Sequence, residues 1–184
     1  MSDPVVSSEE VPAAAPRVSL FYPPETDGHV GLVFDLWPML HACGVDAVLD
    51  PPAAKRREDW PLRVRQELAR ADFVLVTASA EYRARAESAG ATDPTAVPVS
   101  GSGVDEVRRV EVEAAQVREL LLGDPAKWFD RVPPGLLPRG GPEEVPGWLS
   151  TSSFFPRVQR VDVAGCEGLL RLLYWAGDAG DGRV

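Results

Sequence analysis

One stretch in the middle of the chain, residues 44–77, constrains the fold more than any other. Its first apolar run, at 45–49, stops at an Asp-Pro-Pro sequence, as a strand does before a turn. A helix start follows, with Asp59 at the N-cap position and Pro61 just inside the helix. A second, continuous apolar run at 73–76 is typical of a strand covered on both faces. Strand, helix and strand in this order predict a βαβ unit with parallel strands and a right-handed crossover.

The rest of the chain continues the alternation of strands and helices. Further strands are expected at 17–22, 128–137 and 154–163, and further helices at 30–40, 81–87, 104–122 and 164–175. The sum is five strands, which predicts an α/β fold: a doubly wound, five-stranded parallel sheet with helices on both faces. In such a sheet, ligands bind outside the carboxyl ends of the strands.

The ends of the chain differ from its middle in composition. Residues 1–16 are rich in Pro, Ala, Ser and Glu without periodicity, and we expect a disordered arm there. The folded domain is expected at 17–175, with a frayed tail at 176–184. Within the first helix, Pro38 should kink or split the helical pattern.

Composition and charge narrow the class of protein. The chain has 184 residues and a formal net charge of -9, which disfavours nonspecific binding to nucleic acid or to an anionic membrane. It lacks the apolar run of a membrane span and the start of a signal peptide. Cys43 and Cys166 lie far apart, which favours two reduced, buried thiols. We therefore expect a cytoplasmic protein.

Most motifs of catalysis and cofactor binding are missing from the sequence. It contains no GxGxxG after a strand, no phosphate-binding loop and no GxSxG. With two histidines and no clustered ligands, no metal site is expected. His29 follows the first strand and could touch a ligand there. Several glutamates share the helix at 104–122, where a solvated face is the ordinary interpretation and a catalytic carboxylate the less common one.

Lys55, Arg56 and Arg57 form a compact basic run in this acidic chain. The run lies between two prolines and the cap of the next helix, so the loop that carries it is constrained. It is either a solvated turn or a patch that docks on an acidic surface, such as that of a second copy of the protein.

Several segments together resemble a known family. VDAVLD at 45–50, EDWPLRVRQELARADFVLVTASAEYRARAE at 58–87 and the later RVEVEAAQVRELL, WFDRVPPGLLPRGGPEEVPGWL and GCEGLLRLL look like a bacterial SEFIR domain. SEFIR domains are close relatives of the TIR (Toll/interleukin-1 receptor) domain. The resemblance covers residues 17–174 and implies a flavodoxin-like, five-stranded parallel sheet.

The resemblance also implies two functions. It identifies residues 51–58 with the BB loop, through which these domains contact each other, so the basic run would bind a second copy or another SEFIR/TIR-like domain. Some relatives are scaffolds that assemble by homotypic contacts in signalling, without a required cofactor. Others cleave or cyclise NAD once assembled, using a glutamate on the helix after the third strand.

In this chain the position that matches the family's glutamate is Glu113, because residues 110–113 align with a Val-x-Trp-Glu pattern. Its carboxylate could stabilise the oxocarbenium-like state left when nicotinamide departs. Tyr22, Ser79 and Tyr82 would line the pocket for NAD as a substrate. The chain departs from the family at Val112, where a Trp is usual, and at the Pro-Pro sequence after the first strand. Both departures favour the interaction module over the NAD nucleosidase.

Overall fold

The part of the chain that the structure describes forms a sheet of four parallel strands. A computed structural model of the chain describes residues 15–23, 27–49, 60–88, 102–150 and 155–178. Within these residues, the strands lie in the order β2 (Asp46–Leu49), β1 (Arg17–Phe21), β3 (Phe73–Ala78) and β4 (Pro134–Leu136). β1 and β3 occupy the centre, and the 44–77 stretch supplies β2 and β3, which both pair with β1. The predicted α/β fold with a parallel sheet is confirmed.

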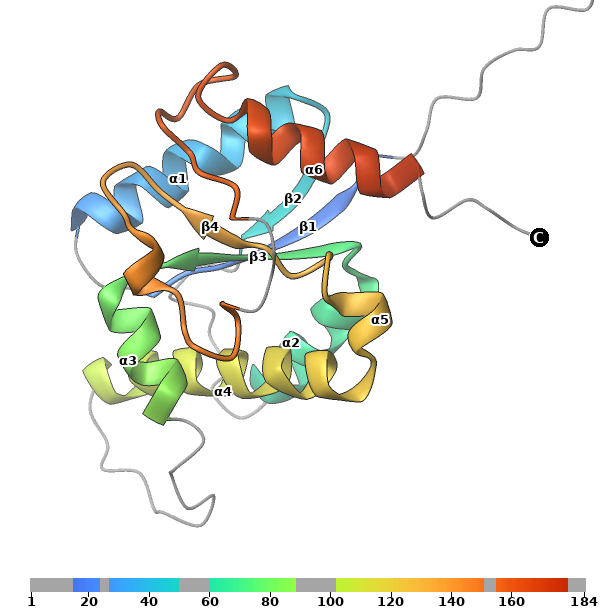
Figure 1. Ribbon diagram of the computed structural model, residues 1–184. Coiled ribbons are helices and arrows are strands. Elements are labelled where there is room, and N and C mark those ends of the chain that lie inside the picture. Colours follow the sequence, from blue (N-terminus) through green and yellow to red (C-terminus); the bar gives the residue numbers. More distant parts are fainter. Residues whose placement is uncertain (1–14, 24–26, 50–59, 89–101, 151–154, 179–184) are drawn as a thin grey trace, which may run out of the picture.

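Helices cover both faces of this sheet (Figure 1). Their bounds are α1 (Asp27–Ala42), α2 (Trp60–Arg70), α3 (Ala80–Ser88), α4 (Ser102–Gly123), α5 (Pro125–Trp128) and α6 (Glu167–Asp178), with a 3₁₀ turn at Pro142–Glu144. Helices α1 and α6 lie on one face, and α2, α3, α4 and α5 on the other. The four-residue helix α5 was not expected from the sequence.

β3 divides the apolar core into two halves. All six of its residues are buried. Because successive side chains of a strand point to opposite faces, Phe73 and Leu75 pack toward α1 and α6, while Val74 and Val76 pack toward α2, α3 and α4. The continuous apolar run in the sequence reflects this burial on both sides.

The prediction of a fifth strand is wrong. The segment predicted as a strand at 154–163 contributes a single parallel bridge, between Arg157 and Leu136 of β4. The backbone N–H of Gln159 then donates to the carbonyl oxygen of Gly165 at 3.1 Å, which turns the chain away from the sheet. A local turn therefore ends the pairing with β4 after Val158, whose N–H donates to the carbonyl oxygen of Leu136.

The end of α1 follows the expectation, and the predicted split of the helix at Pro38 does not occur. Gly44 has a φ of +82°, and the N–H of Val45 donates to the carbonyl oxygen of Leu40 at 3.0 Å, so the glycine closes the helix as predicted. A β-carbon at this position would also lie 3.0 Å from the hydroxyl of Tyr174. Pro38 lies inside α1 without splitting it, since the helix continues to its end beyond the proline.

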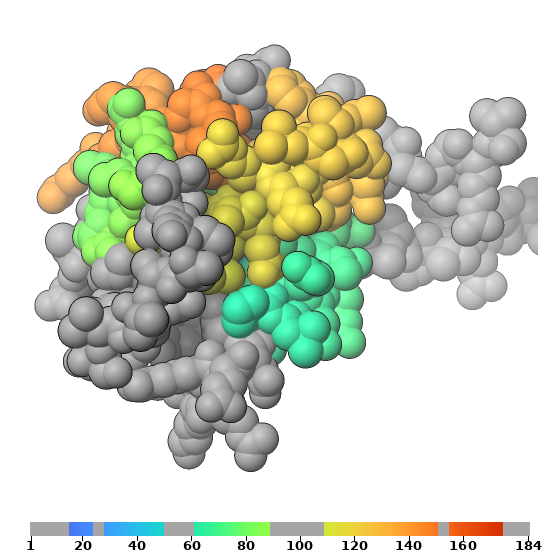
Figure 2. Space-filling model, turned by 90° about the horizontal axis from the view of Figure 1, so that it is seen from below, coloured from blue at the N-terminus to red at the C-terminus, as the bar shows by residue number. Residues whose placement is uncertain are grey.

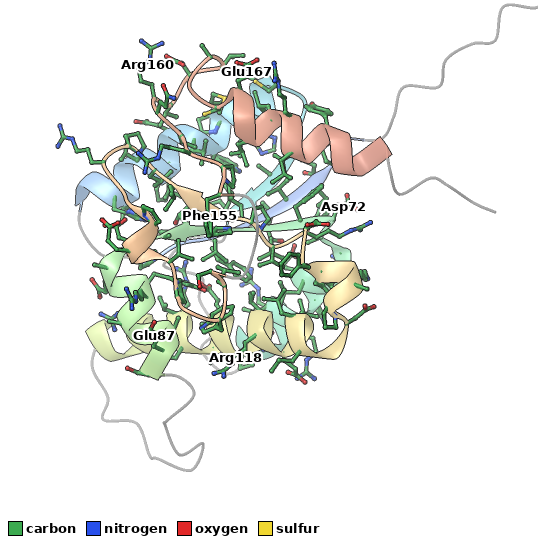
Figure 3. All side chains as sticks on the ribbon, in the orientation of Figure 1. Asp72, Glu87, Arg118, Phe155, Arg160 and Glu167 are labelled. Atoms are coloured by element: carbon green, nitrogen blue, oxygen red, sulfur yellow. The ribbon has the colours of Figure 1, made fainter. Side chains whose placement is uncertain are left out.

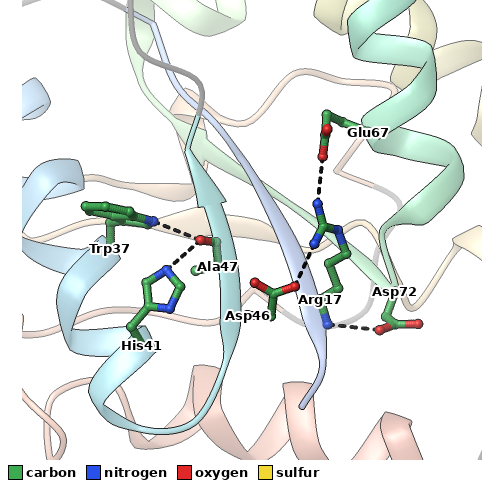
Figure 4. Close-up of polar contacts among 7 residues, drawn as sticks. All are labelled: Arg17, Trp37, His41, Asp46, Ala47, Glu67 and Asp72. Carbon is green, nitrogen blue, oxygen red and sulfur yellow. Dashed lines mark hydrogen bonds and ion pairs between the residues drawn. The ribbon is translucent and has the colours of Figure 1, made fainter. Parts of the chain in front are cut away.

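Contacts within the protein occupy part of each edge of the sheet. At the β2 edge, the indole Nε1 of Trp37 and the Nε2 of His41 each lie 2.8 Å from the carbonyl oxygen of Ala47 (Figure 4). At the β4 edge, the N–H and carbonyl of Leu136 bond to residues 156 and 158. An edge with its polar groups occupied is a poor template for adding a strand.

At the amino ends of the strands, one arginine joins four elements. The guanidinium of Arg17 on β1 contacts Asp46 of β2 at 2.7 Å and Glu67 of α2 at 3.1 Å, and its backbone N–H donates to Asp72 before β3 (Figure 4). Hydrogen bonding to Glu67, and then to Asp46, raises the pKa of Arg17 against the opposing effect of burial. Ion pairs and a hydrogen bond of Arg17 therefore connect β1 with β2, α2 and the start of β3 at this end of the sheet.

Candidate functional site

The carboxyl ends of β1 and β3 bring polar side chains together, as expected for a parallel sheet. Tyr22 follows β1, and Ser79 follows β3; both are buried. The hydroxyl of Thr77 donates to the carbonyl oxygen of Phe21 at 3.1 Å, which ties the two strand ends together. His29 of α1 approaches the same hydroxyl, with its Nε2 at 3.3 Å from Thr77 Oγ1.

Ser79 has a clear local role. Its hydroxyl accepts a hydrogen bond from the backbone N–H of Tyr82 at 3.0 Å. Since α3 begins at the next residue, this is the N-cap bond that starts the helix. The contact fixes Tyr82 in the first turn of α3 and turns it into the interior.

Glu113 lies in the interior of the protein. It sits on the inner face of α4 with 1% of its surface exposed, and its Oε1 accepts from Nε of Arg109 at 3.0 Å. Arg109 is four residues earlier on the same helix and is 7% exposed. The predicted catalytic carboxylate is therefore one member of a buried ion pair.

Arg109 connects this pair to the end of β1. Its guanidinium carbon lies 4.8 Å above the ring centre of Tyr22, and its Nη2 lies 3.5 Å from the carbonyl oxygen of Tyr22. Burial alone would lower the pKa of Arg109, but the carboxylate of Glu113 and then the side chain of Tyr22 outweigh burial and raise it. The guanidinium therefore stays charged and holds the carboxylate and the aromatic ring together.

Tyr82 completes the cluster. It is fully buried, and its hydroxyl has no hydrogen-bond partner among the described residues. Burial, and then the nearby charge of Glu113, raise the pKa of Tyr82 well above its ordinary value of 10.0. The phenol is therefore neutral at any physiological pH, which gives it no role as a base.

The structure thus brings all four residues predicted for a pocket into one region, with no solvent-facing carboxylate among them. We define the buried cluster as Tyr22, Tyr82, Arg109 and Glu113. Sequence reasoning missed Arg109, although the Arg-Glu spacing of four residues on a helix was visible. The basic run at Lys55, Arg56 and Arg57 lies outside the described residues.

Metal binding and thiol chemistry find no support in the described part of the chain. Among these residues, no three His, Cys, Asp or Glu side chains gather as metal ligands would. Both cysteines are free, with Cys166 buried and Cys43 half-buried. Burial raises the pKa of the Cys166 thiol to about 11, so little reactive thiolate forms at neutral pH. No described helix is long and apolar enough to cross a membrane.

Comparison with known proteins identifies the fold. No family model and no curated protein matches the sequence. Among solved structures, the chain is similar to a crystal structure of a prokaryotic SEFIR domain, with a TM-score of 0.60 and 19% identity over 87% of this chain and 93% of that one. The chain therefore has the fold of a SEFIR domain. The resemblance seen in the sequence is confirmed at the level of the fold.

Proposed function

We propose that this chain is a SEFIR/TIR-like interaction module, which assembles through homotypic contacts in signalling or an immune-type response. The observation that carries the proposal is the shared fold, which extends over nearly the whole length of both this chain and the prokaryotic SEFIR domain. The partner is a second copy of the chain or another domain of the same fold.

The partly occupied sheet edges favour contacts made by loops and helices. The Ala47 carbonyl on β2 and both backbone groups of Leu136 on β4 are already bonded within the protein. Pairing of strands between copies would have to break these bonds, so β-sheet extension is the less favourable mode of assembly.

The basic run could make one such loop contact through its positive charge. Lys55, Arg56 and Arg57 fall between β2 and α2, and the whole chain carries a net charge of -9. A compact positive segment on a negative protein attracts a negative surface of another copy, and such attraction weakens as salt screens it.

The test is self-association of the purified chain. We expect the sedimentation coefficient of the wild type to rise with concentration, and we expect Lys55→Glu/Arg56→Glu/Arg57→Glu to remove most of that rise. A matched control with the same change in net charge is Arg157→Glu/Arg160→Glu/Arg171→Glu, at three exposed arginines elsewhere. A triple loop variant that sediments like the wild type would show that the loop is not the contact.

No observation favours the alternative of NAD cleavage. Glu113 is buried and engaged with Arg109, and the phenol of Tyr82 beside it is neutral. We expect no nicotinamide release when concentrated protein is incubated with NAD. Release by the wild type but not by Glu113→Gln, with both proteins folded, would revive the enzyme hypothesis.

A further inference from the structure

A hollow on the outer surface of the domain lies between α3 and α4, on the face shown in Figure 2 with α3 in green and α4 in yellow. It holds about 460 Å³. Its lining is mostly apolar and is made by Ala86, Ala114, Ala115, Arg118, Glu119, Leu122 and Gly123. Because alanine has a small side chain and glycine has none, the two helices leave space between them at the surface. We call this the α3–α4 hollow.

An apolar side chain stands at the rim of the hollow. Leu122, in the last turn of α4, is 73% exposed, the largest exposure among the large hydrophobic residues of the described chain. Burying a leucine side chain in a complex removes apolar surface from water, which favours binding. The same face therefore carries an apolar protrusion, Leu122, and an apolar recess into which such a side chain could fit.

The charges at the hollow match each other as well. Arg118 and Glu119 are adjacent in α4 and both exposed, and Figure 3 shows Arg118 pointing outward from the helix. Neighbouring residues of a helix do not face each other, so these two cannot pair within one chain. Neither forms an ion pair with any group in the described part of the protein. Exposed arginines on α3 and α6 do pair, each with a glutamate four residues away.

We propose that the α3–α4 hollow binds the same hollow of a second copy around a two-fold axis. Leu122 of each copy enters the hollow of the other, and Arg118 of each copy faces Glu119 of the partner subunit. A two-fold contact requires a surface that is complementary to itself, and a protrusion beside a hollow with one positive and one negative side chain meets that requirement. This inference rests on the proposed homotypic function and adds a second contact surface to the basic loop.

The first experiment replaces the protruding side chain. We expect Leu122→Arg to weaken self-association by about tenfold or more in sedimentation equilibrium, since the lost burial corresponds to at least one decade in the dissociation constant. Leu62→Arg is the matched control, because Leu62 is also an exposed leucine, at 55%, and lies on α2 outside the hollow. Equal effects of the two variants, or none from Leu122→Arg, would overturn the inference.

The second experiment exchanges the charges. Arg118→Glu and Glu119→Arg should each weaken the dimer, because each variant places like charges opposite one another. The double variant Arg118→Glu/Glu119→Arg should recover most of the wild-type affinity, because the opposite charges face each other again. Additive weakening in the double variant would contradict the two-fold pairing.

The outcomes separate this inference from the proposed function. If the wild type associates and every hollow variant associates equally well, the homotypic function stands and the α3–α4 contact is wrong. If the wild type remains a monomer at all concentrations, self-association of this chain is ruled out, and the α3–α4 contact with it.

Discussion

Two Arg–Glu pairs on α4 differ in burial and in bonding. Arg109 and Glu113 are four residues apart, face the sheet and bond to each other at 3.0 Å in the interior. Arg118 and Glu119, little more than one turn beyond Glu113, are adjacent, face outward and make no ion pair in the described chain. Helical spacing and depth explain the difference: residues four apart on a helix meet, while neighbours diverge.

The comparison teaches where to look for function on this domain. A charge that is satisfied inside the protein stabilises the fold and is unavailable to a partner. Opposite charges that point outward without partners remain available for a second molecule. Glu113, the predicted catalytic residue, is a charge of the first kind. Arg118 and Glu119 at the α3–α4 hollow are charges of the second kind. The following predictions test this division.

The largest effect is expected from breaking the inner pair. Glu113→Ala would leave the guanidinium of Arg109 buried without its carboxylate, and we expect a loss of about 3–5 kcal/mol in the free energy of unfolding. Urea unfolding monitored by circular dichroism measures it. A loss below about 1 kcal/mol would mean that Glu113 is not held as the buried pair requires.

Removing both charges should cost less than removing one. In Arg109→Met/Glu113→Leu, no charge stays buried alone, and we expect a stability closer to the wild type than to Glu113→Ala. The same urea titration gives the comparison. A double variant as unstable as the sum of the single variants would show that the two side chains act independently.

A smaller effect is expected at Tyr82, whose buried hydroxyl lacks a hydrogen-bond partner among the described residues. Tyr82→Phe removes that polar group at nearly constant shape, so we expect no loss and a gain of up to about 1 kcal/mol. Thermal unfolding is the measurement. A clear loss would indicate that the hydroxyl binds water or a ligand, which would reopen the buried cluster as a binding site.

The same phenol predicts a pH dependence. Burial and Glu113 raise the pKa of Tyr82 above 10.0, so above about pH 10 the unfolded chain releases a proton that the folded chain keeps. The free energy of unfolding should therefore fall as pH rises beyond 10, by up to about 1.4 kcal/mol per pH unit from this group. Urea unfolding at pH 9 and pH 11 tests it, with Tyr82→Phe as the control, because that variant should lose less stability over this interval.

The smallest effect on stability is expected from the outer pair. Glu119→Ala removes an exposed carboxylate without an ion-pair partner, and the free energy of unfolding should change by less than about 0.5 kcal/mol. The variant should nevertheless weaken self-association. Lost stability with unchanged self-association would mean that Glu119 stabilises the fold and does not contact a second copy.

Local patterns in the sequence predicted most of the fold. The strand at 73–76 is visible as a run of apolar residues, and the end of α1 is visible as Gly44. The early end of the segment predicted as the fifth strand was not visible, because it depends on a turn in which the N–H of Gln159 donates to Gly165. That choice is made between segments that are distant from β4 in sequence.

The candidate site divides in the same way. The resemblance placed Tyr22, Ser79, Tyr82 and Glu113 in one region, and the parallel sheet explains why the strand ends converge there. The depth of Glu113 could not be read from α4 alone, since it depends on β1 and α3 packing over that face. For the same reason, the α3–α4 hollow exists only because small residues of α4 meet Ala86 of α3.

The most direct test of the account is sedimentation velocity of the wild-type chain over a wide range of protein concentration. As a homotypic interaction module, the chain should show a sedimentation coefficient that rises with concentration toward that of a dimer or a larger assembly. The rise should become smaller as salt is added, because charged groups contribute to the contacts. A single monomeric species at every concentration would show that the chain does not assemble with copies of itself.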